Sequence, residues 1–134
     1  MSDPRDVLAR YYQAMRDKSA DDLADLYAED AVHEFPFASP GFPPRFQGRE
    51  AVRAGYRGAW GRSPVRVERI EVAAVHDTGD PEVVVAEHTV VASLPGRTGT
   101  VDVPGLLVLR VRDGRLVQVR DYMDGLGVRN AVGR

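Results

Sequence analysis

The chain has 134 residues, which predicts a single domain over residues 1–134, because single domains commonly hold about 100–150 residues. Apolar residues make up 43% of the sequence and charged residues 28%, a composition typical of a folded globular protein. No apolar run exceeds four residues, which argues against a membrane-spanning segment, and the 18 basic and 20 acidic side chains are too evenly mixed to indicate nucleic-acid binding. The lack of cysteine excludes disulfides and thiol chemistry and favours a cytoplasmic location.

The first half of the chain is predicted to be mostly helical. Residues 3–18 begin with Asp3 and Pro4, a capping residue followed by a proline at the first helical position, and continue with apolar residues at helical spacing. A second helix is expected to start at Ser19 and to carry Leu23, Leu26 and Tyr27. A third helix is expected over residues 49–60.

The segments between the second and third helices are predicted to be extended or irregular. Residues 31–35 have the pattern of a short strand. The stretch from Pro36 to Arg45 is so rich in proline that we expect an irregular loop.

The second half of the chain is predicted to be β-sheet, because 17 of the 20 valines lie at or after Val65. The expected strands are separated by turn signals, the strongest being Asp113-Gly114, and cover residues 64–76, 82–93, 99–112 and 115–124. Since residues 106–109 are all apolar, we expect that strand to be covered on both faces. The order of elements predicts an α+β domain with three helices packed on one face of a strongly curved, mostly antiparallel sheet.

Three motifs are informative when read together with the order of the predicted elements: Leu26-Tyr27-Ala28-Glu29-Asp30-Ala31-Val32, Gln47-Gly48-Arg49-Glu50-Ala51-Val52 and Val119-Arg120-Asp121-Tyr122-Met123-Asp124. They resemble the nuclear transport factor 2-like superfamily, and more narrowly its SnoaL-like (polyketide-cyclase-like) and ketosteroid-isomerase-like branch. The resemblance covers nearly the whole chain. It implies a cone-shaped half-barrel whose mouth holds a small apolar ligand, and a homodimer formed through the sheet. The fold hosts enzymes and non-catalytic binding modules, so it does not by itself fix an activity.

The resemblance transfers few catalytic residues. At the ketosteroid isomerase positions, the tyrosine is matched by Tyr11 but the aspartate base by Phe35, and the late acid falls near Leu106 or Leu107, so we reject steroid isomerisation. In the limonene-epoxide-hydrolase branch, the arginine–aspartate pair is replaced by His88 and Val90.

One aspartate position is shared by two enzymatic branches. Asp124 matches the final aspartate of the epoxide hydrolases and that of the polyketide cyclases, where it stands in a Tyr122-x-Asp124 ending. The resemblance therefore implies that Asp124 acts as an acid or base.

Strand alternation points to a different aspartate. His88 shares a strand face with Ala86, Val90 and Ala92, so an inward imidazole is expected, and a carboxylate would be a suitable partner for it. On the last strand Asp121 shares a face with Val119, whereas Asp124 has the opposite parity. We keep both aspartates as candidates.

A second polar pair is His33 and Glu34, of which only one can point into a pocket. Phe35 shares the face of His33, which favours His33 as the inward side chain. The expected site holds His33, His88 and an aspartate as catalytic groups. Its expected substrate-binding walls are formed by Tyr11, Phe35, Tyr56, Trp60 and Tyr122. A histidine–carboxylate pair suits proton transfer near neutral pH.

Structural alternatives accompany each of these candidates. Both histidines could be satisfied core groups, Asp121 could form an ion pair with Arg120 or Arg110, and Asp124 could cap the turn at Gly125. The aromatic side chains could simply form core. No metal site and no cofactor are expected, since the spacing does not demand three converging ligands. The 17 arginines, against one lysine, are expected on the solvated surface.

Three functions remain open. The first is a small enzyme that carries out cofactor-free general acid–base chemistry of the cyclase, isomerase or dehydratase type on a small apolar substrate. The second is a non-catalytic ligand-binding or dimerisation module. The third is an epoxide hydrolase with an altered catalytic set, which would need a second acid near Asp124.

Overall fold

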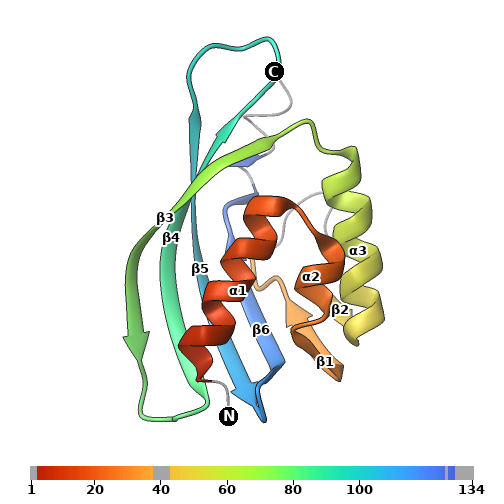
Figure 1. The fold of residues 1–134 in the computed structure, drawn as a ribbon, viewed down its shortest axis with the longest axis vertical. Coiled ribbons are helices and arrows are strands. Elements are labelled where there is room, and N and C mark those ends of the chain that lie inside the picture. Colours follow the sequence, from red (N-terminus) through yellow and green to blue (C-terminus); the bar gives the residue numbers. More distant parts are fainter. Residues whose placement is uncertain (1–2, 38–42, 126, 129–134) are drawn as a thin grey trace.

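The computed structural model describes residues 3–37, 43–125 and 127–128. Over these residues the chain forms an α+β domain with three helices and a six-stranded curled sheet that does not close (Figure 1). The elements in chain order are α1 (Pro4–Asp17), α2 (Ala20–Ala24), β1 (Tyr27–Glu34), β2 (Arg45–Gln47), α3 (Arg49–Arg62), β3 (Arg66–Asp77), β4 (Val83–Ser93), β5 (Val101–Arg112) and β6 (Arg115–Met123).

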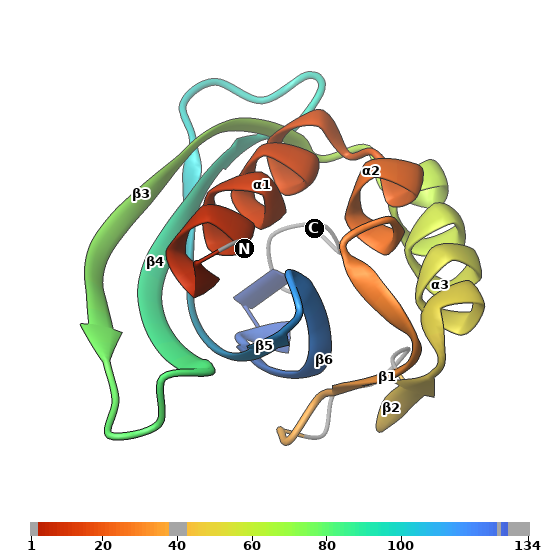
Figure 2. The same ribbon diagram turned by 60° about the horizontal axis from the view of Figure 1, so that its bottom comes forward.

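The strands follow the spatial order β2-β1-β6-β5-β4-β3, and each neighbouring pair is antiparallel except β1 and β6, which run parallel. Figure 2 shows the sheet curling around α1, with α2 and α3 on the side of β1 and β2. Helix α1 packs against β3, β4 and β5, and α3 packs against β1 and β2. The parallel pairing brings the first strand of the chain beside the last.

The four long strands agree with the sequence prediction to within two residues at each end. The Asp113-Gly114 turn has positive φ at both positions, 53° and 77°, which is the backbone of a type I′ two-residue hairpin. Helix α1 begins as predicted, since the side chain of Asp3 accepts a hydrogen bond from the Arg5 amide.

The second predicted helix was too long, and the following strand was too short. Helix α2 ends at Ala24, and Tyr27 opens β1, where it pairs with Leu116 of β6. Local helical spacing did not reveal this long-range pairing. Strand β2 was not predicted; it takes up Arg45 at the end of the expected loop, of which residues 38–42 lie outside the described part of the chain.

The expectation that residues 106–109 are covered on both faces was wrong for the single chain. Leu107 and Leu109 are buried under the helices, while Leu106 and Val108 on the other face are only partly buried. The reason is that the helices cover one face of the sheet only. Among the described residues, no helix has the length and apolar character needed to cross a membrane.

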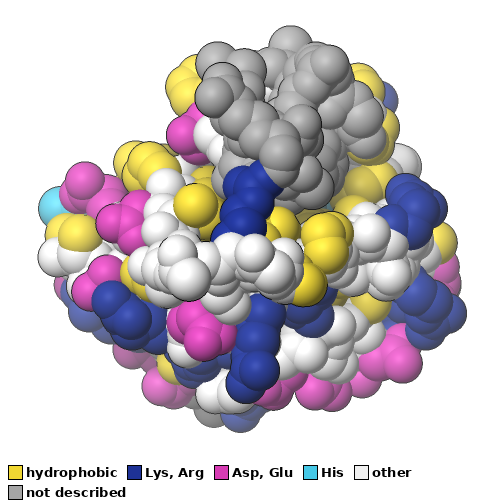
Figure 3. Space-filling model, turned by 90° about the horizontal axis from the view of Figure 1, so that it is seen from above, with side chains coloured by type: hydrophobic (Ala, Val, Ile, Leu, Met, Phe, Trp, Pro, Cys, Tyr) yellow, Lys and Arg dark blue, Asp and Glu magenta, His cyan; other side chains and the backbone are white. Residues whose placement is uncertain are grey.

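The surface carries interspersed basic and acidic side chains, as Figure 3 shows for one face. Some of these charges connect elements. Arg53 on α3 contacts Asp21 at 2.7 Å and Asp25 at 3.1 Å, which links α3 to α2 and its C-terminus. Exposed ion pairs of this kind contribute little each, about 0–1 kcal/mol.

Candidate functional site

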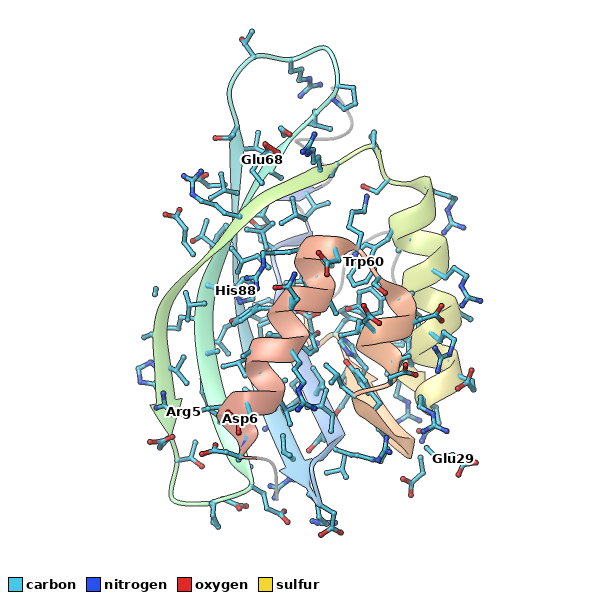
Figure 4. All side chains as sticks on the ribbon, viewed as in Figure 1. Arg5, Asp6, Glu29, Trp60, Glu68 and His88 are labelled. Atoms are coloured by element: carbon cyan, nitrogen blue, oxygen red, sulfur yellow. The ribbon has the colours of Figure 1, made fainter. Side chains whose placement is uncertain are left out.

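A cavity of about 220 Å³ lies between the concave face of the sheet and helices α1 and α3. Most of its lining is apolar, with side chains such as Val67, Val90 and Val103. The side chains with polar atoms in the lining are Tyr11, Lys18, Tyr56, Trp60, Ser63, His88 and Asp121. Figure 4 shows His88 on β4 and Trp60 on α3 pointing into the space between sheet and helices.

Asp121 supplies the carboxylate of the cavity wall. It lies on β6 with Val119 two residues before it and Met123 two residues after it, so strand alternation turns its side chain toward the concave face. Its Oδ2 atom lies 3.2 Å from Nε2 of His33 and accepts a 3.2 Å hydrogen bond from the Tyr56 hydroxyl. The side chain is 13% exposed, so these two groups hold a largely buried carboxylate.

His33 lies behind Asp121 and is fully buried. It comes from β1, at the register position opposite Val119 of β6. Its Nδ1 lies 2.7 Å from the Tyr27 hydroxyl. Because an ionised carboxylate can only accept, Nε2 carries the hydrogen that faces Asp121, and in the neutral imidazole Tyr27 then donates to Nδ1.

Tyrosine hydroxyls from β1 and α3 contact the His33–Asp121 pair. The Tyr56 hydroxyl lies 3.1 Å from Nε2 of His33. Burial raises the pKa of Tyr11, Tyr27 and Tyr56, and the nearby charge of Asp121 raises the pKa of each further. The three phenols therefore stay protonated, and those of Tyr27 and Tyr56 are hydrogen-bond donors to Nδ1 of His33 and to Oδ2 of Asp121.

His88 provides a second imidazole on another wall. Its Nδ1 lies 2.9 Å from the Tyr12 hydroxyl of α1. Burial lowers the pKa of His88, and the charge of Asp121 offsets this in part, so the ring is neutral at neutral pH. Gly105, its register partner on β5, leaves room for the ring, because a Cβ there would lie 2.8 Å from Nε2 of His88.

Lys18 lines the cavity at the end where α1 finishes and the chain passes from α3 to β3. It is the C-cap of α1, with φ of 51°. Its ammonium donates hydrogen bonds to two backbone carbonyls, those of Ser63 at 3.1 Å and Val65 at 2.8 Å. Burial lowers the pKa of Lys18.

Four residues assigned to the site from the sequence do not line the cavity: Tyr122, Asp124, Phe35 and His33. Tyr122 is on the opposite face of β6, because adjacent strand residues point to opposite faces, and it packs against Phe37 with ring centroids 5.3 Å apart. Asp124 follows the strand, and its Oδ1 accepts a 2.8 Å hydrogen bond from the Gly127 amide, so it caps the following turn. Phe35 packs on the ring of His33 behind the lining.

The other predicted residues come together. Tyr11, Tyr56 and Trp60 line the cavity with His88 and Asp121. His33 reaches the cavity only through Asp121 and Tyr56, which is a more remote position than the sequence suggested.

Three residues of the site were not predicted from the sequence. Tyr12 and Tyr27 are the partners of the two histidines, where a carboxylate was expected for His88. The sequence held a signal for both: a buried imidazole needs a hydrogen-bond partner, and two tyrosines lie on predicted core faces. For Lys18, the signal was its standing as the one lysine in a chain with 17 arginines.

Within the described residues, no group of three or more histidine or acidic side chains is arranged to hold a metal ion. The chemistry that the arrangement can perform is proton transfer. One carboxylate with ordered donors and one neutral imidazole face the same apolar space.

Comparison with known proteins gives matches over nearly the whole chain. The family model of the SnoaL-like domain matches residues 8–119. The chain is 30% identical over 131 residues to the uncharacterised PhzA/B-like protein PA3332 of Pseudomonas aeruginosa, covering 96% of this chain and 89% of that protein. A crystal structure from Bacillus subtilis, provisionally described as an isomerase, is 27% identical with a TM-score of 0.84, covering 97% of this chain and 92% of that one.

A likeness of fold alone extends further. An LEH-like epoxide hydrolase of M. tuberculosis is 20% identical with a TM-score of 0.68, and the match covers 98% of this chain and 90% of that one. The fold family includes cyclases, isomerases and epoxide hydrolase-like members.

Proposed function

Because the chain belongs to the SnoaL-like family of the nuclear transport factor 2-like superfamily, we propose that it is a small enzyme that performs general acid–base chemistry of the isomerase, cyclase or dehydratase type. The observation that carries this proposal is the carboxylate of Asp121 in the wall of an apolar cavity, with Oδ2 held by His33 and Tyr56. Its substrate is a small apolar molecule.

In the proposed reaction Asp121 is the base. A largely buried carboxylate loses part of its hydration, and its remaining partners hold one oxygen and leave Oδ1 for a substrate proton. Among the described residues, both hydrogen-bond partners of Asp121 contact Oδ2, and none contacts Oδ1. The neutral ring of His88 is suited to donate an N–H to a substrate oxygen on which charge develops.

The size of the cavity supports a small substrate. Its volume of about 220 Å³ is below the roughly 300–1,000 Å³ typical of ligand pockets. The predominantly apolar lining favours a substrate that presents hydrocarbon to most of the wall.

The proposal is tested by proton exchange, which requires no knowledge of the product. Small ketones with acidic α-hydrogens are incubated with the protein in D₂O, and the loss of the α-hydrogen signal is followed by NMR. We expect exchange above the buffer rate with the wild-type protein. Asp121→Asn should lower this rate by roughly 10²–10⁴-fold, the usual contribution of a general base.

Asp124→Asn is the matched control for this experiment. The substitution is the same, but Asp124 lies outside the cavity, and asparagine also caps turns well. The proposal is wrong if both variants retain the wild-type exchange rate on every ketone that the protein accelerates, or if no ketone exchanges faster than in buffer.

The non-catalytic binding module is the second candidate. The observation in its favour is that the polar groups of the site satisfy one another: both imidazoles have tyrosine partners, and Asp121 has two donors. This candidate predicts that small apolar molecules quench Trp60 fluorescence while no proton exchange is accelerated.

The epoxide hydrolase alternative receives less support from the cavity. It requires two acids around one water, but among the lining residues that the structure describes Asp121 is the one carboxylate. Asp124, the residue that the resemblance selected, is engaged by the Gly127 amide.

We also propose that the chain forms a homodimer through the outer face of the sheet. Leu106, Val108 and Tyr122 line a shallow groove there, and Phe37 beside it is 62% exposed. A second copy would cover this apolar surface. Light scattering should give a dimer for the wild type and a monomer for Leu106→Glu, whereas a wild-type monomer contradicts the proposal.

A further inference from the structure

We infer that Lys18 makes one end of the cavity a binding site for an anionic group, and that the substrate is therefore a small apolar carboxylate. This inference rests on the proposed function, because it names the class of molecule that the cavity receives. Lys18 was not among the residues that the sequence indicated, and the acid–base chemistry above does not use it.

The geometry leaves one donor of Lys18 free for a ligand. An ammonium has three N–H groups, and the carbonyls of Ser63 and Val65 accept two of them, at 3.1 Å and 2.8 Å. These two carbonyls fix the position of Nζ at the wall, since Ser63, Val65 and Lys18 all belong to the lining. A carboxylate entering the cavity can accept the third.

The charge of Lys18 is not balanced within the described residues. No acidic side chain lies within 4 Å of it there, and among the described lining residues it is the one Lys or Arg side chain. The arginines behave differently: Arg53 and Arg110, for example, contact carboxylates at the surface. A partly desolvated cation without a counterion favours an anionic ligand.

The lowered pKa of Lys18 agrees with this picture. Its cause is burial, and no neighbouring carboxylate opposes it. A bound anion would raise that pKa again, because it stabilises the charged form.

Lys18 and Asp121 lie at different levels of the sheet. Val65, which holds the ammonium, precedes Val67, the register partner of Ala92. Asp121 pairs with Leu107, which pairs with Ala86, six residues earlier on β4. A ligand whose carboxylate is at Lys18 can therefore direct its other end toward Asp121, which keeps two negative charges apart.

A purely structural role for Lys18 is the competing explanation. Ser63 is the C-cap of α3, and a lysine near a helix C-terminus stabilises exposed carbonyls without any ligand. The two roles differ in one measurable respect: only a ligand site makes the affinity depend on the charge of the ligand.

The chain offers two unique reporters for this test. It has one tryptophan, Trp60, and one lysine, Lys18, and both line the cavity. Fluorescence of Trp60 reports whether the cavity is occupied. Lysine labelled with ¹³Cε and ¹⁵Nζ gives a single side-chain signal, which reports whether the ligand reaches the ammonium.

The experiment titrates the full chain with phenylacetate and with phenylacetamide, which match in shape and differ in charge. We expect phenylacetate to bind at least about tenfold more tightly by Trp60 fluorescence, as a charge-assisted hydrogen bond implies. We also expect it to shift the Lys18 signal and to raise the pKa of Lys18. Phenylacetamide should leave that pKa unchanged.

Lys18→Met should remove the preference for phenylacetate, so that both probes bind the variant with the affinity that phenylacetamide has for the wild type. Arg16→Met is the control, because it removes the same charge from the last turn of α1 but lies outside the cavity lining. The Arg16→Met variant should still bind phenylacetate more tightly than phenylacetamide. The wild-type labelling experiment decides the question even if Lys18→Met does not fold.

The inference is overturned by equal affinities of the two probes, by a carboxylate preference that survives in Lys18→Met, or by Trp60 saturation without a change at Lys18. Failure of both probes to bind also overturns it. None of these results depends on the rate of proton exchange, so the roles of Lys18 and Asp121 are separated.

Discussion

Nε2 of His33 lies 3.2 Å from Oδ2 of Asp121, although 88 residues separate them in the sequence. The contact exists because β1 and β6 are parallel neighbours, which sets His33 opposite Val119 and two positions from Asp121. The imidazole is fully buried, and the carboxylate is 13% exposed. A histidine on the first strand thus orients the acid that faces the cavity from the last.

The hydroxyl of Tyr27 should be required for the stability of this arrangement. Tyr27→Phe leaves Nδ1 of His33 without its partner inside the protein, and an unsatisfied buried group costs about 1–3 kcal/mol. Urea denaturation measures the loss. Tyr122→Phe on the outer face is the control and should change the free energy of unfolding by less than about 0.5 kcal/mol. Equal losses would contradict the assigned role of Tyr27.

His88 should make stability depend on pH. Burial lowers its pKa in the folded protein below the ordinary value of about 6.5, so the unfolded chain takes up the proton first as the pH falls. Above about pH 6.5 His88 is neutral in both the folded and the unfolded chain, so its contribution to the free energy of unfolding is complete. Below that pH the free energy of unfolding should decrease, by at most about 1.4 kcal/mol per pH unit, until the pH reaches the folded-state pKa.

This dependence is measured by urea denaturation of the wild type and of His88→Gln between pH 7.5 and pH 5. The wild type and His88→Gln both retain His33 and His76. The difference between their free energies of unfolding therefore reports the contribution of His88 alone. A wild-type stability that rises toward pH 5 relative to His88→Gln would show that the folded state favours the charged ring.

Asp124 should matter for stability and not for ligand binding. Asp124→Ala removes the acceptor of the Gly127 amide, and loss of such a cap costs about 0.5–2 kcal/mol. Thermal unfolding measures this cost. Phenylacetamide should bind the variant with the wild-type affinity, as judged by Trp60 fluorescence. A large loss of affinity at unchanged stability would instead place Asp124 in the cavity wall.

The sequence predicted the orientation of the polar strand residues because alternation is a local rule. Strand alternation alone predicted that His88 and Asp121 face the concave side of the sheet, and no information about their neighbours was needed. The Asp113-Gly114 turn and the valine-rich strands likewise depend on local conformation, which is why their positions were predicted closely.

What escaped prediction depends on contacts between distant segments. Tyr27 has the spacing of a helical residue but pairs with Leu116, and the partner of His88 is Tyr12, a residue that helical spacing marks only as apolar. The preference for Asp124 came from resemblance to a family, and the parity of β6 did not support it. Where the two arguments disagreed, the geometry of the strand gave the position of the side chain.

Gly105 should be required for the position of His88. The two residues are register partners on β4 and β5, and a Cβ at residue 105 would lie 2.8 Å from Nε2 and 3.1 Å from Cε1 of the ring. Gly105→Ala must therefore displace the ring from Tyr12 or move the strand, and overpacking of this kind costs about 1–3 kcal/mol. Thermal unfolding should show the loss, and the NMR signal of His88 should shift.

The matched control is Gly61→Ala in α3, where an added Cβ meets no atom within 4 Å. Because alanine is the better helix former, this variant should be as stable as the wild type or more stable, by up to about 1 kcal/mol. If Gly105→Ala were equally well tolerated and left the His88 signal in place, the ring would have room that the register of β4 and β5 does not provide. His88 would then be free to turn, and its bond to Tyr12 would not define the wall of the cavity.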